Sequence, residues 1–136
     1  MMHKKLNCVL LVDDNEAVNY LHSRFIKASG ITDAIVALES AEQALNYLCT
    51  DKQAHTFPEL MFLDINMPAM DGWNFIEQYK EKLGESTSKP KIFMLTTSIN
   101  PNDRLRAQAY KEIDGFHTKP MTGEMLQSIM DDHFES

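Results

Sequence analysis

Five polar side chains that could carry chemistry stand at or near the ends of short apolar runs in this chain. In order they are two neighbouring acids, a third acid, a hydroxyl and an amine: Asp13, Asp14, Asp64, Thr96 and Lys119. Apolar runs of about four residues are too short for isolated helices and are typical of buried strands. Ligands of open α/β sheets bind outside the carboxyl ends of the strands, so this set predicts a functional site at that edge.

The segment around Asp64 has the clearest local pattern. The apolar run 60–63 ends on this acid, and Pro68 prevents the strand from continuing because it has no N–H. The pair Asp71-Gly72 is typical of a turn and also suits the start of a helix. We therefore expect a strand, an acid, a loop and a helix in that order. Asp64 alone would indicate no more than a solvated loop aspartate, and it gains its meaning from the rest of the set.

Apolar runs and helical spacing alternate along the whole chain. The expected strands are 8–12, 34–38, 60–63, 92–95 and 115–117. Four of the expected helices begin at Asn15, Ser40, Asp71 and Asn100, and a fifth carries residues 125–130. Gly30 is the expected stop of the first helix, and Ser40 with Gln43 forms a capping box for the second. This alternation predicts parallel strands joined by helical crossovers.

The residues expected to face the core from these helices lie at helical spacing. Helix by helix they are Val18, Leu21, Phe25 and Ile26; Ala41, Ala44, Leu45 and Leu48; Ile76, Tyr79 and Leu83; Leu105 and Ala109, with Ile113 as a third candidate; and Met125, Leu126, Ile129 and Met130. Trp73 and Phe75 lie beside the third of these faces, where core packing explains them better than ligand stacking. His22 falls within the first stripe, and we expect a half-buried, hydrogen-bonded histidine rather than a phosphorylated one.

Five motifs in order resemble the receiver domain of bacterial two-component response regulators over nearly the whole chain. The motifs are Val12-Asp13-Asp14, Leu63-Asp64-Ile65-Asn66-Met67-Pro68, Met70-Asp71-Gly72, Leu95-Thr96-Thr97 and Thr118-Lys119-Pro120. The resemblance implies a flavodoxin-like α/β fold, which is a doubly wound five-stranded parallel sheet of order 2-1-3-4-5 with helices on both faces. In that order the first and third strands are neighbours, which brings Asp13 and Asp14 beside Asp64.

A cluster of three carboxylates predicts a metal ion. Carboxylates held close together repel one another at neutral pH unless a cation shares the site. Oxygen ligands suit Mg2+ better than metals that prefer thiolate or imidazole, so we expect Mg2+ as the cofactor. The resemblance implies that Asp14 and Asp64 supply carboxylate oxygens to it. By the same resemblance the backbone carbonyl of Asn66 is a third ligand, and Asp13 acts mostly through water.

The expected reaction is phosphoryl transfer to an aspartate. Asp64 is the expected nucleophile, which takes a phosphoryl group from the phosphohistidine of a histidine kinase or a histidine phosphotransfer protein. By resemblance, Lys119 pairs with Asp64 and then with a phosphoryl oxygen, and Thr96 donates its hydroxyl to another. We expect the chain to catalyse only its own phosphorylation and dephosphorylation, so it is not an enzyme with an external substrate.

The resemblance also implies a switch and a partner surface. Thr96 moves toward the phosphoryl group, and an aromatic side chain in the fifth strand fills the vacated space; that residue is Phe116 here, where the commonest pattern has tyrosine. The downstream partner is expected on the face of the fourth helix, fifth strand and fifth helix. Arg104 and Arg106 on that helix are more often solvated than bound to a partner. The peptide bond Lys119-Pro120 is usually cis in the family.

Composition limits the possibilities independently. A chain of 136 residues with 43% hydrophobic content fits one domain, residues 1–136 with a core over about 6–134, without an output domain. A formal net charge of -7 disfavours a nucleic-acid partner. The N-terminal apolar run is short and stops at two aspartates, so it is not a secretory signal, and no longer apolar run follows. We therefore expect a cytoplasmic protein without a membrane partner. Cys8 and Cys49 show no metal spacing and are expected to be reduced.

Other functions remain open at this point. Within the leading interpretation, a phosphorelay shuttle, a terminal output protein and a phosphate sink are equally compatible with the motifs. A phosphorylation-independent binding module is a second possibility, although all five motifs are intact. A phosphohydrolase of the haloacid dehalogenase kind also uses an aspartate at a strand end with Mg2+. It requires a second aspartate two residues later, where this chain has Asn66.

Overall fold

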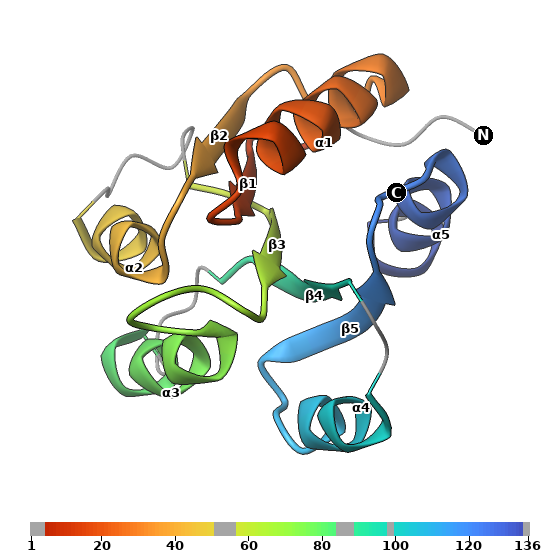
Figure 1. Ribbon diagram of the computed structural model, residues 1–136. Coiled ribbons are helices and arrows are strands. Elements are labelled where there is room, and N and C mark those ends of the chain that lie inside the picture. Colours follow the sequence, from red (N-terminus) through yellow and green to blue (C-terminus); the bar gives the residue numbers. More distant parts are fainter. Residues whose placement is uncertain (1–4, 51–56, 84–88, 98–99, 135–136) are drawn as a thin grey trace.

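The computed structural model describes residues 5–50, 57–83, 89–97 and 100–134. Its elements, in chain order, are β1 (Val9–Val12), α1 (Glu16–Ser29), β2 (Ile35–Leu38), α2 (Ala41–Thr50), β3 (Leu60–Asp64), α3 (Gly72–Leu83), β4 (Lys91–Thr96), α4 (Pro101–Gln108), β5 (Ile113–Thr118) and α5 (Gly123–His133). The strands form one parallel sheet of order β2-β1-β3-β4-β5 (Figure 1). The predicted flavodoxin-like fold is confirmed.

Helices cover both faces of the sheet, and each face has its own apolar core. The residues of α2 and α3, with Ala107 of α4, pack on one face, and Ile26 of α1 packs with α5 on the other (Figure 1). The central strands are buried on both sides, since every residue of β1 and β3 is buried. Continuous apolar runs are therefore the correct signal for these strands, and their polar ends mark one edge of the sheet.

Helix α1 differs from the prediction in the residues that it buries. Its ends are as expected, because the Asn15 side chain accepts hydrogen bonds from the first turn and Gly30 closes the helix at a φ of 75°. The buried residues are Asn19, His22 and Ile26, whereas Leu21 and Phe25 are 45% and 39% exposed. The predicted apolar stripe was therefore wrong for these two residues, because Asn19 lies inward together with the expected His22 and Ile26.

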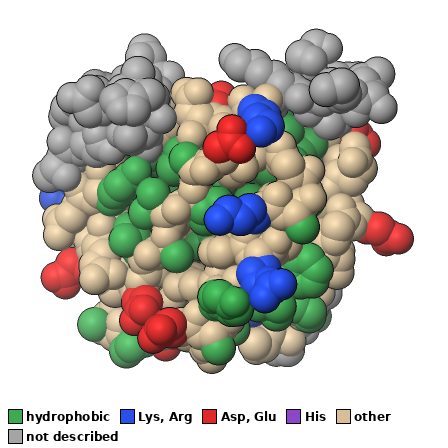
Figure 2. All heavy atoms as spheres, turned by 90° about the horizontal axis from the view of Figure 1, so that it is seen from above, with side chains coloured by type: hydrophobic (Ala, Val, Ile, Leu, Met, Phe, Trp, Pro, Cys, Tyr) green, Lys and Arg blue, Asp and Glu red, His purple; other side chains and the backbone are tan. Residues whose placement is uncertain are grey.

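Three large apolar side chains of α1 are exposed: Tyr20, Leu21 and Phe25. Tyr20 is 64% exposed, and the Arg24 guanidinium lies 5.8 Å from its ring centroid. From the α1 side of the molecule, the top of Figure 1, hydrophobic side chains lie among lysine and arginine side chains (Figure 2).

Within the described residues no helix has the length and apolar character needed to cross a membrane.

Helix α4 is the second departure from the prediction. Leu105 is 65% exposed and Ala109 is exposed, and the buried residue is Ala107. Ala107 packs in the apolar core, and two arginine side chains of the helix lie over aromatic rings of neighbouring elements. The guanidinium of Arg106 lies 4.6 Å from the ring centroid of Trp73 in α3, and that of Arg104 lies 5.6 Å from the ring of Phe116 in β5.

Strand β5 is longer than predicted, because it begins at Ile113 rather than at Gly115. Ile113 is thus a strand residue and not part of the α4 face. The start of the strand was missed because the polar Asp114 interrupts the apolar run. The carboxylate of Asp114 accepts a hydrogen bond of 2.9 Å from the Ile92 N–H. This contact lies at the register irregularity between β4 and β5.

The remaining predicted elements are confirmed. Ser40 caps α2 by accepting from the Gln43 N–H, and Asp71 caps α3 by accepting from the Asn74 N–H. The expected inward residues of α2 and α5 are buried, except that Met125 is half-buried. In α3, Leu83 is half-buried, while Ile76, Tyr79, Trp73 and Phe75 are buried in the core. Neither Cys8 nor Cys49 forms a disulfide bond within the described residues.

Candidate functional site

The sheet order brings the three predicted acids together. Strands β1 and β3 are neighbours with Val12 opposite Leu63, so the residues that follow lie at the same level. Carboxylate oxygens of Asp13, Asp14 and Asp64 all lie within 4.8 Å of one another. Asp13 and Asp64 are buried and Asp14 is exposed, so the cluster opens to solvent on one side. Acids that are separated by about fifty residues in the chain therefore form one cluster.

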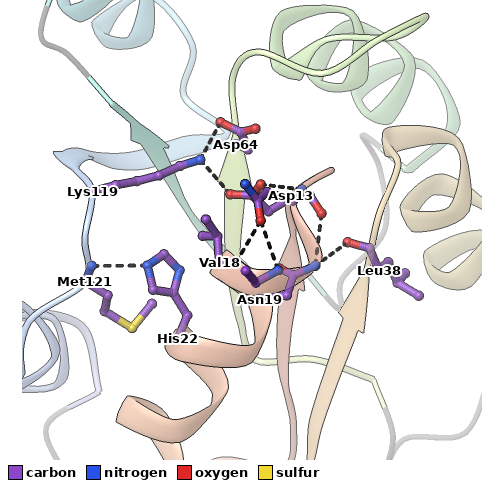
Figure 3. Close-up of polar contacts among 10 residues, drawn as sticks. Asp13, Val18, Asn19, His22, Leu38, Asp64, Lys119 and Met121 are labelled. Atoms are coloured by element: carbon purple, nitrogen blue, oxygen red, sulfur yellow. Dashed lines mark hydrogen bonds and ion pairs between the residues drawn. The ribbon is translucent and has the colours of Figure 1, made fainter.

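Lys119 bridges two of these acids from the end of β5. Its Nζ lies 2.6 Å from Oδ2 of Asp13 and 3.1 Å from Oδ1 of Asp64 (Figure 3). The expected pair with Asp64 is present, and the shorter contact is to Asp13. The backbone N–H of Lys119 donates to the carbonyl of Thr96 at 2.8 Å, and the peptide bond to Pro120 is cis. The lysine is thus held at its backbone as well as at its amine.

The electrostatics of the cluster follow from burial and like charge. Burial raises the pKa of Asp64 to about 6, the negative charge of Asp13 adds to the rise, and Lys119 opposes it. Burial lowers the pKa of Lys119, but its hydrogen bonds to Asp13 and Asp64 outweigh burial, so the net pKa is raised. Negative charge at Asp64 is therefore costly without a further cation, while the lysine stays charged.

The donor set fits a hard divalent cation. All three side chains present carboxylate oxygens, which Mg2+ prefers, and a neutralising ion would offset the burial and the repulsion from Asp13 that raise the pKa of Asp64. Asn66 is exposed on the loop just after Asp64. The Gly72 N–H donates to the carbonyl of Ile65 at 2.8 Å, which closes this loop onto the start of α3.

Gly72 is required by this close approach. A Cβ atom at this position would lie 2.9 Å from the backbone oxygen of Asp64 and 3.0 Å from Cα of Ile65. Only a residue without a side chain lets α3 begin this close to the acid. The motif Asp71-Gly72 thus combines a helix cap with a packing contact behind Asp64.

The two predicted switch residues lie on the same face of neighbouring strands. Thr96 ends β4 opposite Thr118, and Phe116 lies opposite Met94, so the alternation of side chains places Thr96 and Phe116 on one face. Thr96 is buried, and Phe116 is half-buried against the core of α2 and α3. His117 points to the other face, where its ring centroid lies 5.9 Å from that of Phe93.

Two residues that support the site were not predicted in this role. The Asn19 amide donates to the backbone carbonyls of Asp13 and Leu38, at 2.9 Å and 3.2 Å, and so ties the ends of β1 and β2 to α1 (Figure 3). His22 accepts a hydrogen bond of 3.2 Å from the Met121 N–H (Figure 3). The prediction of a hydrogen-bonded His22 is confirmed, although the side chain is fully rather than half buried.

Comparison with known families decides the affiliation of this site. The sequence profile of the response regulator receiver domain matches residues 9–131. The chain belongs to this family. The match spans β1 through most of α5, so all residues of the acidic cluster, Thr96, Phe116 and Lys119 lie inside the receiver domain. The predicted family is confirmed.

Individual relatives agree with this affiliation. The receiver domain is 29% identical over 125 residues to the probable methanogenesis regulatory protein FilR2 of Methanothrix harundinacea, covering 91% of this chain and 79% of the relative. It is 30% identical over 123 residues to the response regulator Rre1 of Synechocystis sp., covering 90% of this chain and 49% of the relative. The receiver domain thus spans about half the length of Rre1.

The fold is also that of a solved response regulator. A crystal structure of a two-component response regulator from Cytophaga hutchinsonii matches with a TM-score of 0.88 and 29% identity, covering 95% of this chain and 97% of that chain. The receiver domain therefore has both the sequence and the architecture of its family, with an acidic cluster that is consistent with a metal site.

Proposed function

We propose that this receiver domain accepts a phosphoryl group on Asp64 from the phosphohistidine of a histidine kinase or a histidine phosphotransfer protein. The observation that supports this most is the cluster at the ends of β1 and β3, where three acids and a lysine share one small volume. Asp14 is the exposed member of the cluster, so the phosphoryl donor would approach the buried Asp64 from that side. The domain then signals in trans by binding another protein.

The transfer step needs only Asp64 as the protein nucleophile. One carboxylate oxygen of Asp64 forms a bond to phosphorus while the P–N bond of the donor phosphohistidine breaks. The electron pair of the broken bond returns to the imidazole nitrogen, which takes up a proton from solvent. Because its pKa is about 6, Asp64 is mostly ionised at neutral pH and is available for this attack. Water later attacks the phosphorus, which frees the carboxylate and releases inorganic phosphate.

Lys119 and Thr96 act on the transferred group. Lys119 already lies 3.1 Å from an oxygen of Asp64, so its amine can pair with a phosphoryl oxygen without leaving the cluster. Thr96 ends the strand beside Asp64 and donates its hydroxyl to another phosphoryl oxygen. Both side chains stabilise negative charge where it develops during transfer.

A magnesium ion completes the proposed site. The carboxylates of Asp14 and Asp64 and the backbone carbonyl of Asn66 would hold it, with Asp13 acting through water. When bound, Mg2+ supplies positive charge that offsets the charge of the transferring group. The geometry in favour of this assignment is the 4.8 Å cluster of carboxylate oxygens.

The switch proceeds through Thr96 and Phe116 in this proposal. When Thr96 turns toward the phosphoryl group, Phe116 moves into the space that Thr96 vacates. This movement takes the ring away from the Arg104 guanidinium, which now lies 5.6 Å from its centroid. The surface of α4, β5 and α5, which includes the exposed Leu105, therefore changes on phosphorylation and is the proposed site of the output partner.

The proposal is tested by the intact mass of the protein after incubation with acetyl phosphate, with and without Mg2+. We expect a single phosphoryl adduct that requires Mg2+ and is absent from Asp64→Asn. Asp33→Asn is the matched control, because Asp33 is an exposed acid that pairs with Lys5 elsewhere on the surface. An adduct of equal yield on Asp64→Asn would refute the nucleophile. If wild type forms no adduct and binds no beryllofluoride, the chain is a phosphorylation-independent binding module instead.

A further inference from the structure

Helix α1 buries two polar side chains and leaves several of its apolar side chains exposed. Asn19 and His22 are 5% and 2% exposed, while Tyr20 is 64% exposed one residue away from Asn19. A helix normally buries its apolar residues, and a buried polar side chain is costly unless it forms hydrogen bonds. The hydrogen-bond partners of Asn19 and His22 therefore explain why these two side chains lie inward. The partners are backbone groups at the edge of the sheet that carries the acidic cluster.

The partner of His22 belongs to the loop that carries Lys119. This loop, residues 119–121, has two backbone N–H groups, because Pro120 has none. The Lys119 N–H donates to the Thr96 carbonyl of β4 at 2.8 Å. The Met121 N–H donates to Nε2 of His22 at 3.2 Å, and Met121 is fully buried. The loop is therefore fastened on one side to the sheet and on the other side to α1.

The hydrogen bond determines the chemical form of the imidazole. Because Nε2 accepts, it carries no proton, and the neutral ring has its proton on Nδ1. Burial lowers the pKa of His22, the negative charge of Asp13 acts against this, and the positive charge of Lys119 acts with it. His22 thus accepts from the loop without adding a second positive charge beside Lys119 (Figure 3).

We propose that His22 is a positioning residue for Lys119, acting through the Met121 N–H. This inference rests on the proposed function, in which the Lys119 amine must stay between Asp13 and Asp64. The amine sits 2.6 Å and 3.1 Å from their oxygens, and the backbone of its loop is fixed two residues later by His22. Loss of the acceptor leaves a buried N–H without a partner, so the loop shifts to find one and moves the lysine.

Three variants separate positioning from packing. His22→Leu removes the acceptor, and His22→Gln keeps one, because its Oε1 reaches about as far as Nε2. Ile26→Ala is the control, since Ile26 is the next buried residue of α1 and belongs to the apolar core. We expect phosphorylation by acetyl phosphate to slow about tenfold or more in His22→Leu and to stay near the wild-type rate in the other two. If His22→Leu does not fold, His22→Asn replaces it, because its shorter side chain does not reach the loop.

Two further measurements exclude a merely structural effect. The affinity for Mg2+, measured by calorimetry, should not fall in His22→Leu, because Lys119 is not a metal ligand and its positive charge opposes the ion, whereas collapse of the acidic cluster would lower the affinity. In the Lys119→Met background, His22→Leu should cause no additional slowing, since no amine remains to be positioned. A wild-type rate in His22→Leu, an equal loss in His22→Gln, or an undiminished effect in Lys119→Met would overturn the inference. If wild type itself takes up no phosphoryl group, the proposed function fails and the inference falls with it.

Discussion

At the scale of single residues, the site depends on one unfavourable charge. Asp64 is buried beside Asp13, and among the described residues Lys119 is the cation that pairs with both carboxylates. The resulting pKa of about 6 makes the folded protein hold a proton on Asp64 that the unfolded chain releases near pH 4. The site is thus prepared for a cation and for a phosphoryl group at the expense of stability.

This expense predicts a specific dependence of stability on pH. Because the pKa of Asp64 is raised in the folded state, its contribution is fully present below pH 4 and is lost as the pH rises through about 6. Without Mg2+, Asp64→Asn should not show this loss. The difference in free energy of unfolding between Asp64→Asn and wild type should therefore increase, by up to about 3 kcal/mol in favour of Asp64→Asn, from pH 4 to pH 7.5. Urea unfolding between pH 4 and pH 8 measures the difference. Parallel curves for wild type and Asp64→Asn would show that the charge of Asp64 carries no such cost.

At the scale of elements, the position of Asp64 depends on how closely α3 approaches the end of β3. The helix starts at Gly72, whose missing side chain allows contact with the Asp64 backbone. The opposite case is Gly123 at the start of α5, where a Cβ atom would meet nothing within 4 Å. The same residue type at two helix starts therefore has two different meanings.

Alanine at these two glycines should have opposite effects. Gly72→Ala places a methyl group 2.9 Å from the backbone oxygen of Asp64, so we expect about 1–3 kcal/mol of destabilisation and slower phosphorylation. Gly123→Ala should be neutral or stabilise by up to about 1 kcal/mol, because alanine favours the helix. Thermal unfolding and the rate of adduct formation check both variants. Equal stability of the two proteins would contradict the packing role of Gly72.

The elements also show where sequence reasoning succeeds and fails. Strand ends were predictable, because the buried runs before Asp13 and Asp64 are continuous and stop at a charge. The α1 stripe was predictable only in part, since Asn19 lies inward to reach the backbone carbonyls of Asp13 and Leu38. The prediction of the inward α4 face was wrong. The Arg106 guanidinium lies over the Trp73 ring, and apolar spacing in the sequence does not reveal such a contact. The start of β5 failed because Asp114 interrupts its apolar pattern.

At the scale of the whole molecule, the proposed metal site and the fold are coupled. The acidic cluster joins the ends of β1 and β3, so a cation bound there connects these two strands, while Lys119 after β5 pairs with Asp13 and Asp64. Any ligand that binds the folded chain but not the unfolded chain stabilises the fold by mass action. The formal net charge of -7 adds a general attraction for cations, which a control must separate from specific binding.

Magnesium should therefore stabilise the protein through the cluster. At a concentration ten times its dissociation constant, Mg2+ should add about 1.4 kcal/mol to the free energy of unfolding of wild type. Asp14→Asn removes the exposed carboxylate of the cluster and should lose most of this gain, whereas Asp33→Asn should keep it. Thermal unfolding in MgCl2, compared with NaCl of equal ionic strength, measures both effects. An equal gain for both variants would mean that Mg2+ acts only by general screening.

The contact between α3 and α4 has a spectroscopic consequence. Trp73 is the chain's one tryptophan, so it alone supplies the indole fluorescence of the protein. It follows Gly72 at the start of α3, is 4% exposed, and lies beneath the Arg106 guanidinium and beside the Tyr110 ring. A charged group above the ring and a phenol beside it both influence indole emission. The protein therefore contains a natural chromophore between the acidic cluster and α4, and movement of that helix becomes visible as a change in emission without any attached label.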